Sequence, residues 1–180
     1  TFTAHHYTRE NADTFYMAGN EYYNRKSFMA ALLNSAGQKA KGTVPEMMQQ
    51  FADFIRDRDE PLFILDDAHK LKDRVLHMAV ILANSVLGSA GIVIMGDDRL
   101  RSRIMDGVNA KRVGYDEIYK SIGRRFISLG SLGPNDVALV CRANNIWDEE
   151  VIAAIKEECN NNLHHATRLI NQATHYKIAA

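Results

Sequence analysis

The chain has 180 residues, in which 22 Lys and Arg balance 22 Asp and Glu, and 46% of the residues are hydrophobic. This composition is typical of one globular domain with at most a small appendage, and it excludes a disordered acidic or basic tail. Because the net charge is zero, binding to nucleic acid or to a membrane surface would depend on a local patch.

The apolar pattern alternates between a strand period and a helix period, which predicts an α/β layer protein with a parallel sheet. Four short apolar segments are predicted to be strands: residues 14–18, 62–65, 91–95 and 126–129. The middle two are apolar on both faces, as is typical of parallel strands covered by helices on both sides. We therefore expect these two strands to be central.

Between the strands, apolar residues at three- and four-residue spacing predict crossover helices around residues 28–33, 47–55 and 71–86. The second of these helices has a start signal, because Thr43 and Glu46 have the spacing of a capping box and Pro45 suits a first helical turn.

After residue 129 the pattern becomes helical. Residues 130–134 are predicted to be a linker, and three short helices are expected near residues 134–143, 147–158 and 163–176. We therefore predict an α/β core over residues 1–130 and a small helical domain over residues 131–180.

The environment of the protein is indicated by two absences. The apolar runs are much shorter than the ~20 residues that span a bilayer. Cys141 and Cys159 have no paired cysteine spacing, so we expect reduced thiols in a cytoplasmic protein.

The seven His residues include no His-Glu-x-x-His run, and a dedicated zinc site is not expected.

The most specific feature is the apolar segment 62–65, which is followed directly by Asp66 and Asp67 and then by a helix pattern. Carboxylates at the carboxyl end of a central parallel strand lie where ligands bind in open α/β sheets. One acid could hold a hydrated Mg²⁺ while the other orients a water molecule. Alternatively, both acids cap the following helix.

In its sequence context, this segment resembles a Walker B motif. The chain as a whole resembles an AAA+ P-loop ATPase of the phage-Mu B-type transposition group, which is related to the origin-recognition ATPases. The resemblance rests on residues 15–17, 21–25, 64–68, 91–96 and 117–126 and on the helical end. It implies an ATP-binding domain with a helical lid that couples ATP binding and hydrolysis to homo-oligomerisation on DNA and that helps a transposase choose its target.

A phosphate-binding loop of the Gly-x-x-x-x-Gly-Lys-Ser/Thr type is absent from the printed sequence. The segment from Gly19 to Lys26 and Ser27 is only a near match, because Arg25 stands where the second Gly should be. The resemblance implies that Thr1 is the last residue of that loop and a ligand of Mg²⁺ together with Asp66. The first strand and most of the loop would then precede Thr1, with residues 2–13 forming the next helix. The alternative is that Thr1 is an arbitrary fragment start.

The remaining site residues are also implied by the resemblance, and several depart from its pattern. Asp67 stands where a Glu usually activates water, and Asp97 occupies the position of a polar phosphate sensor, although it could equally cap a helix with Asp98. Arg124 and Arg125 lie where an arginine finger is expected to reach a neighbouring subunit; a solvated surface pair is the alternative. His164 stands at the position of a second sensor in the lid, or is a helix-surface residue.

Residues 99–125 carry eight basic and three acidic residues, an excess that could contact DNA phosphates. The helical segment 136–158 carries six acids and two bases, which makes it an unsuitable DNA contact. Two hypotheses follow from these observations. The first is an ATPase domain, and the second is a related interaction domain that has lost ATP hydrolysis and binds a protein or DNA independently of ATP.

Overall fold

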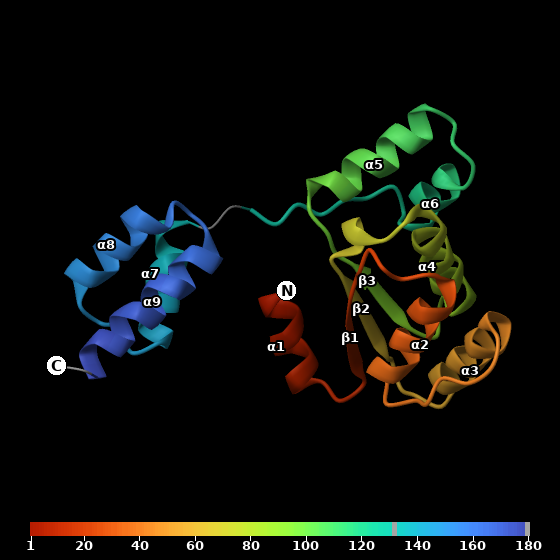
Figure 1. Cartoon of the computed structure of the whole chain (residues 1–180), viewed down its shortest axis with the longest axis horizontal. Helices are drawn as coiled ribbons and strands as arrows, with labels where there is room; N and C mark the ends of the chain where they lie inside the picture. Colours follow the sequence, from red (N-terminus) through yellow and green to blue (C-terminus); the bar gives the residue numbers. More distant parts are fainter. Residues whose placement is uncertain (131–132, 179–180) are drawn as a thin grey trace. The chain divides into compact units, whose positions relative to one another are not determined.

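The structure, a computed structural model, describes residues 1–130 and 133–178 and contains a parallel β-sheet (Figure 1). Its strands are β1 (Thr14–Ala18), β2 (Leu62–Asp66) and β3 (Gly91–Ile94), in the spatial order β1-β2-β3. Both strand pairs are parallel, with Thr14 opposite Leu62 and Leu62 opposite Gly91. The carboxyl ends of the three strands therefore meet at one edge of the sheet. The prediction of an α/β fold with a parallel sheet is confirmed.

The chain forms two compact units, residues 1–126 and 127–180. The helices of the first unit are α1 (Phe2–Glu10), α2 (Arg25–Ser35), α3 (Val44–Arg56), the short 3₁₀ helix η1 (Ala68–Lys70), α4 (Asp73–Ser85), α5 (Asp98–Asn109) and α6 (Tyr115–Ser121). Those of the second unit are α7 (Pro134–Ala143), α8 (Glu149–Cys159) and α9 (Leu163–Ile178). The expected linker includes residues 131–132, which lie outside the described residues.

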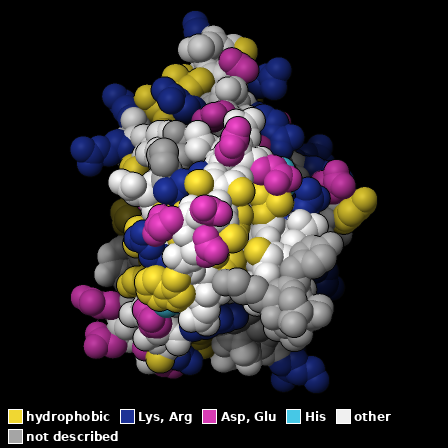
Figure 2. Space-filling view, turned by 90° about the vertical axis from the view of Figure 1, so that its left-hand side faces the viewer, with side chains coloured by type: hydrophobic (Ala, Val, Ile, Leu, Met, Phe, Trp, Pro, Cys, Tyr) yellow, Lys and Arg dark blue, Asp and Glu magenta, His cyan; other side chains and the backbone are white. Residues whose placement is uncertain are grey.

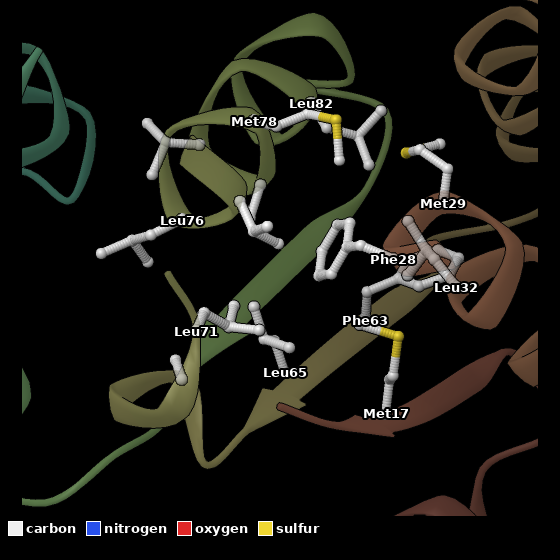
Figure 3. Close-up of a cluster of buried hydrophobic side chains, with 14 of the residues drawn as sticks. Met17, Phe28, Met29, Leu32, Phe63, Leu65, Leu71, Leu76, Met78 and Leu82 are labelled. Atoms are coloured by element: carbon white, nitrogen blue, oxygen red, sulfur yellow. The ribbon is translucent and has the colours of Figure 1, made fainter. Parts of the chain in front are cut away.

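The main core lies on one face of the sheet, where side chains from alternate strand positions pack against α2, α3 and α4 (Figure 3). Phe63 and Leu65 of β2 are buried there beside Met17 of β1 and Phe28 of α2. Burial of large apolar side chains of this kind contributes about 1.5–3 kcal/mol each. The other face of the sheet is contacted by α1, because the ring of His5 lies against the ring of Tyr16 with centroids 4.0 Å apart.

The predicted start of α3 is confirmed. Thr43 is the N-cap residue, Pro45 lies in the first turn, and the Glu46 carboxylate accepts hydrogen bonds from the Thr43 N–H (2.6 Å) and hydroxyl (2.7 Å). The apolar residues that follow at helical spacing, Met47, Phe51 and Ile55, are buried against the sheet.

The prediction for segment 126–129 is wrong, because these residues form no strand. A strand exists only where a ladder partner satisfies its backbone groups, and among the described residues none pairs with this segment. Its alternate side chains Ile127 and Leu129 are 88% and 87% exposed.

The expectation that residues 91–95 are central is also wrong for the described sheet, where β2 is central and β3 is at the edge. The residues of β3 alternate between exposed and partly buried, and Val93 is 40% exposed. The apolar character of β3 therefore does not correspond to full burial within the described chain, and its outer backbone edge is open.

The second unit has its own small core, which includes Val137, Cys141, Ile152 and Ile170. Cys141 and Cys159 are both buried in it as free thiols, and burial raises the pKa of the Cys141 thiol. On the molecular face presented in Figure 2, acidic, basic and hydrophobic side chains are interspersed.

Candidate functional site

The carboxyl ends of the three strands converge closely. Gly19, directly after β1, donates its N–H to the Asp66 carbonyl at 2.7 Å, and Ala68, after β2, donates its N–H to the Met95 carbonyl at 2.9 Å. Gly19 is required by this close approach, since a Cβ there would lie 2.5 Å from the Asp67 carbonyl oxygen. This edge of the sheet therefore carries the predicted acidic pair.

Thr1 and Asp66 are brought together although they are 65 positions apart in the sequence. The Thr1 hydroxyl donates a 2.6 Å hydrogen bond to Asp66 Oδ2. Thr1 is the N-cap residue of α1, so the start of this helix is placed against the end of β2. The pairing of these two residues was expected from the family resemblance alone.

The Asp66 side chain is buried, with 4% of the residue exposed, and is surrounded by hydrogen-bond donors. Oδ1 accepts the Asp67 N–H at 2.7 Å, and Oδ2 accepts the Tyr16 hydroxyl at 2.9 Å in addition to Thr1. Burial by itself would raise the pKa of Asp66, but the hydrogen bonds from Thr1, Asp67 and Tyr16 together lower this pKa below its ordinary value. The carboxylate is therefore charged at neutral pH and suited to a cation.

Asp67 lies beside this carboxylate in a left-handed backbone conformation, with φ 51° and ψ 30°. Such a conformation is uncommon for a residue with a side chain, although Asp adopts it more readily than most. The Asp67 carboxylate accepts a 2.6 Å hydrogen bond from Lys70 Nζ and makes no capping bond to η1. The helix-capping alternative for Asp66 and Asp67 is therefore not supported.

Asp97 follows the end of β3 and is the N-cap residue of α5, where its side chain accepts the Arg99 N–H at 3.0 Å. Arg99 Nε also donates to Asp97 at 2.7 Å, and His69 Nε2 lies 3.7 Å from Asp97 Oδ2. The hydrogen bond from the Arg99 side chain is the main cause of a lowered pKa of Asp97. Asp97 thus caps a helix, and its negative charge is paired with a guanidinium.

Two contacts near the acidic pair were not anticipated from the sequence. Tyr16 donates its hydroxyl to Asp66, and Arg103 of α5 donates from Nη1 to the carbonyls of His69 (3.3 Å) and Leu71 (2.8 Å). Arg103 thereby holds the turn that follows Asp67. Neither contact has a local sequence signal, because one depends on strand register and the other on the packing of α5 against η1.

Three other predicted site residues, Arg124, Arg125 and His164, are exposed. Arg124 and Arg125 are exposed and follow α6, Arg124 with a positive φ of 57°. His164 is exposed on the first turn of α9 in the second unit. Among the described residues, no hydrogen bond or ion pair connects Arg124 or Arg125 to Asp66 or Asp67.

Several basic side chains of residues 99–125 already bind other groups of the chain. Arg99 and Lys120 are engaged in ion pairs with Asp97 and Asp116, and Arg103 binds backbone carbonyls. Five exposed cations have no ion-pair partner in the described part of the chain: Arg101, Lys111, Arg112, Arg124 and Arg125. Arg101 lies over the Phe126 ring, with Cζ 5.6 Å from the centroid.

The oxygen donors of Thr1 and Asp66 fit Mg²⁺, a hard cation that prefers oxygen and is commonly bound through one or two carboxylates together with water and phosphate oxygens. Within residues 1–130 and 133–178, no group of three or more His, Cys, Asp or Glu side chains is close enough to hold a metal. A magnesium ion at this edge would thus depend on phosphate oxygens for further ligands.

Two other places do not suit a nucleotide. In the near-match segment, the N–H groups of Lys26 and Ser27 are bound by the Asn24 side chain at 2.9 and 3.0 Å, so they are not free for a phosphate. A surface hollow lies near the amino ends of β1 and β2, where carboxylates outnumber the single arginine and would repel phosphate. Its charged lining residues are Asp13, Glu46, Asp53, Asp57, Arg58 and Asp59.

In the described residues, no helix combines the length and the apolarity needed to cross a membrane. Among proteins with curated descriptions, none matches the chain. A family model described as AAA domain matches residues 1–104, more than half of the chain and the part that contains the whole sheet and the acidic pair. AAA domains are nucleotide-binding ATPase modules that generally use ATP with Mg²⁺. The chain belongs to the AAA domain family.

Proposed function

We propose that this chain is an ATPase domain in which Thr1 and Asp66 hold the magnesium ion of bound ATP and Asp67 orients the attacking water. The observation that carries the proposal is the 2.6 Å hydrogen bond between Thr1 and Asp66 at the carboxyl edge of the sheet in a member of the AAA domain family. When bound, the magnesium ion neutralises charge on the phosphates. The buried, charged Asp66 supplies a fixed ligand, and Asp67 is next to it in the chain.

A phosphate-binding loop is required for this function, and we propose that it precedes Thr1 and follows a further strand that pairs with β3. The open edge of β3, the 40% exposure of Val93 and the unpaired apolar segment 126–129 support an additional strand there. The sequence encoded immediately upstream of Thr1 tests this point. An apolar strand followed by Gly-x-x-x-x-Gly-Lys would agree with it, and any other sequence would contradict it.

The residues around the pair set limits on the rate of hydrolysis. The Lys70 ammonium is hydrogen-bonded to Asp67 Oδ2 and offsets the charge of this carboxylate, while Oδ1 remains available to a water molecule. The Asp97 charge is neutralised by Arg99, which removes the repulsion that a free carboxylate would exert on a γ-phosphate. We expect slow hydrolysis that Asp67→Asn lowers further, with Asp116→Asn as a surface carboxylate control. Equal phosphate release by Asp67→Asn and the wild type would contradict the role of Asp67.

The family resemblance also supports a more specific proposal, in which the protein is a homo-oligomer that assembles on DNA and cooperates with a transposase. In this proposal Arg124 or Arg125 acts across a subunit interface. The second unit serves as a lid, in which His164 approaches the nucleotide. Five exposed cations without an ion-pair partner in the described part of the stretch 99–125 support a DNA contact. Replacing Lys111 and Arg112 by Ala should reduce the salt dependence of DNA affinity by about two phosphate contacts. An unchanged salt slope would exclude these residues from the contact.

The alternative is an interaction domain that has lost hydrolysis. It is favoured by the internal ion pairs of Asp67 with Lys70 and of Asp97 with Arg99, which occupy both acids that follow the strands. This alternative requires partner or DNA binding that does not respond to ATP. Light scattering separates the two functions, because an ATP-dependent change in oligomer size is expected only of the ATPase.

A further inference from the structure

Tyr16 connects the two strands that build the edge of the site. It lies in β1 on the same face of the sheet as Ala18, and Ala18 is the register partner of Asp66. Tyr16 is therefore a diagonal neighbour of Asp66 on this face, close enough for a long aromatic side chain to reach it. Its hydroxyl reaches Asp66 Oδ2 at 2.9 Å.

This hydrogen bond completes a fixed set of contacts around the carboxylate. Asp66 accepts from Tyr16 and Thr1 through Oδ2 and from the Asp67 N–H through Oδ1. A carboxylate has about four lone-pair positions, so about three are filled. Because the terminal torsion of Asp has a broad preference, these bonds rather than the rotamer determine the plane of the carboxylate.

The phenol is itself held in place. The His5 ring lies against the Tyr16 ring with centroids 4.0 Å apart and planes tilted by 38°. His5 belongs to α1, whose N-cap Thr1 donates to the same Asp66 oxygen. One helix thus fixes both donors of Oδ2, one directly and the other through a ring contact.

We propose that Tyr16 is a positioning residue that orients the Asp66 carboxylate for a divalent cation; this inference rests on the proposed function. The phenol leaves the Asp66 charge in place and prevents the carboxylate from rotating away from Thr1. Such control affects cations unequally. Mg²⁺ requires near-ideal octahedral geometry, whereas Ca²⁺ accepts irregular ligand arrangements. Tyr16 thus favours Mg²⁺ over Ca²⁺ at this edge.

The test is Tyr16→Phe, which removes only the hydroxyl and keeps the ring that contacts His5. In the full natural protein with ADP, binding of Mn²⁺ is measured by electron paramagnetic resonance, and Mg²⁺ and Ca²⁺ are measured by displacement. We expect Mn²⁺ and Mg²⁺ affinity to fall by about tenfold, because a carboxylate freed from Tyr16 must be ordered when the cation binds, with Ca²⁺ changed by less than about twofold. Tyr23→Phe, which alters another partly buried tyrosine that packs on Phe28, should match the wild type.

The outcomes test the role of Tyr16 separately from the proposed function. Unchanged Mg²⁺ and Mn²⁺ affinity in Tyr16→Phe, or an equal loss for Mg²⁺ and Ca²⁺, overturns the role of Tyr16 and leaves the proposed function standing. Absence of saturable Mn²⁺ binding in the wild type overturns both. A measurement without a variant is the nuclear magnetic resonance spectrum of ¹³C-labelled tyrosines. Mg²⁺ with ADP should shift the Tyr16 ring signals and leave those of Tyr23 in place, and an unmoved Tyr16 signal overturns the inference.

Discussion

Replacing Gly19 by Ala tests the close approach that assembles the candidate site. The new Cβ would lie 2.5 Å from the Asp67 carbonyl oxygen, 3.0 Å from the Asp67 carbonyl carbon and 3.1 Å from the Asp66 carbonyl oxygen. All three are backbone atoms, so no flexible side chain can move aside. The two segments must separate, which weakens the 2.7 Å hydrogen bond from the Gly19 N–H to the Asp66 carbonyl.

The expected magnitude combines three effects. Overpacking costs about 1–3 kcal/mol, and the weakened hydrogen bond costs about 1 kcal/mol. The lower entropy of the unfolded chain with Ala offsets roughly 0.4–1 kcal/mol, since Gly19 does not have the positive φ that would strain Ala. The free energy of unfolding should therefore fall by about 1–3.5 kcal/mol, which lowers the melting temperature by roughly 3–17 °C in a unit of this size.

Urea and thermal unfolding followed by circular dichroism measure this change. The matched control is Gly130→Ala, because a Cβ at Gly130 meets nothing within 4 Å, and its free energy of unfolding should stay within about 0.5 kcal/mol of the wild type. If Gly19→Ala is as stable as that control, the segments after β1 and β2 are not in contact as described, and the arrangement of the site is wrong.

Three further predictions concern single side chains. Arg103→Met should lower the free energy of unfolding by about 2–4 kcal/mol and speed amide exchange of residues 68–71, because the His69 and Leu71 carbonyls lose a charged donor. The control Arg101→Met should lower it by less than about 1 kcal/mol. Equal effects of the two substitutions in urea unfolding would refute this. Tyr16 should ionise at a pKa of about 12, chiefly because it is buried. Its contribution to stability is therefore present below about pH 10 and is lost as the pH rises through 12. An absorbance titration of tyrosine ionisation in which Tyr16→Phe does not remove the component at highest pH would contradict this. The pKa of Glu46 is lowered, first of all by its hydrogen bond from the Thr43 N–H. Glu46 therefore stabilises α3 above about pH 4.3, and this stabilisation is lost as the pH falls through the folded pKa. Glu46→Gln should flatten this part of the acid unfolding curve, and an unchanged curve would refute the cap.

The sequence predicts elements well where one local pattern determines the outcome. Strands β1 and β2 are found because their buried apolar residues follow one another directly, and α3 is found because Thr43, Pro45 and Glu46 act within one helical turn. The acidic pair is found because carboxylates directly follow a buried strand.

Local pattern fails where the outcome depends on a distant partner. Segment 126–129 has the composition of a strand, but no described strand pairs with it, and β3 is apolar yet lies at an edge. The contact of Tyr16 with Asp66 requires the register of β1 on β2, which no single segment reveals.

The central claim is that Thr1 and Asp66 form a magnesium–nucleotide site, and calorimetric titration of ATP into the full natural protein tests it most directly. With Mg²⁺ present, we predict saturable binding by the wild type that is lost in Asp66→Ala, with Asp116→Ala, which removes a surface carboxylate, binding as the wild type does. Circular dichroism of the Asp66→Ala protein verifies that it remains folded. Absence of ATP binding by the wild type, or binding that is unchanged in folded Asp66→Ala, would contradict the account.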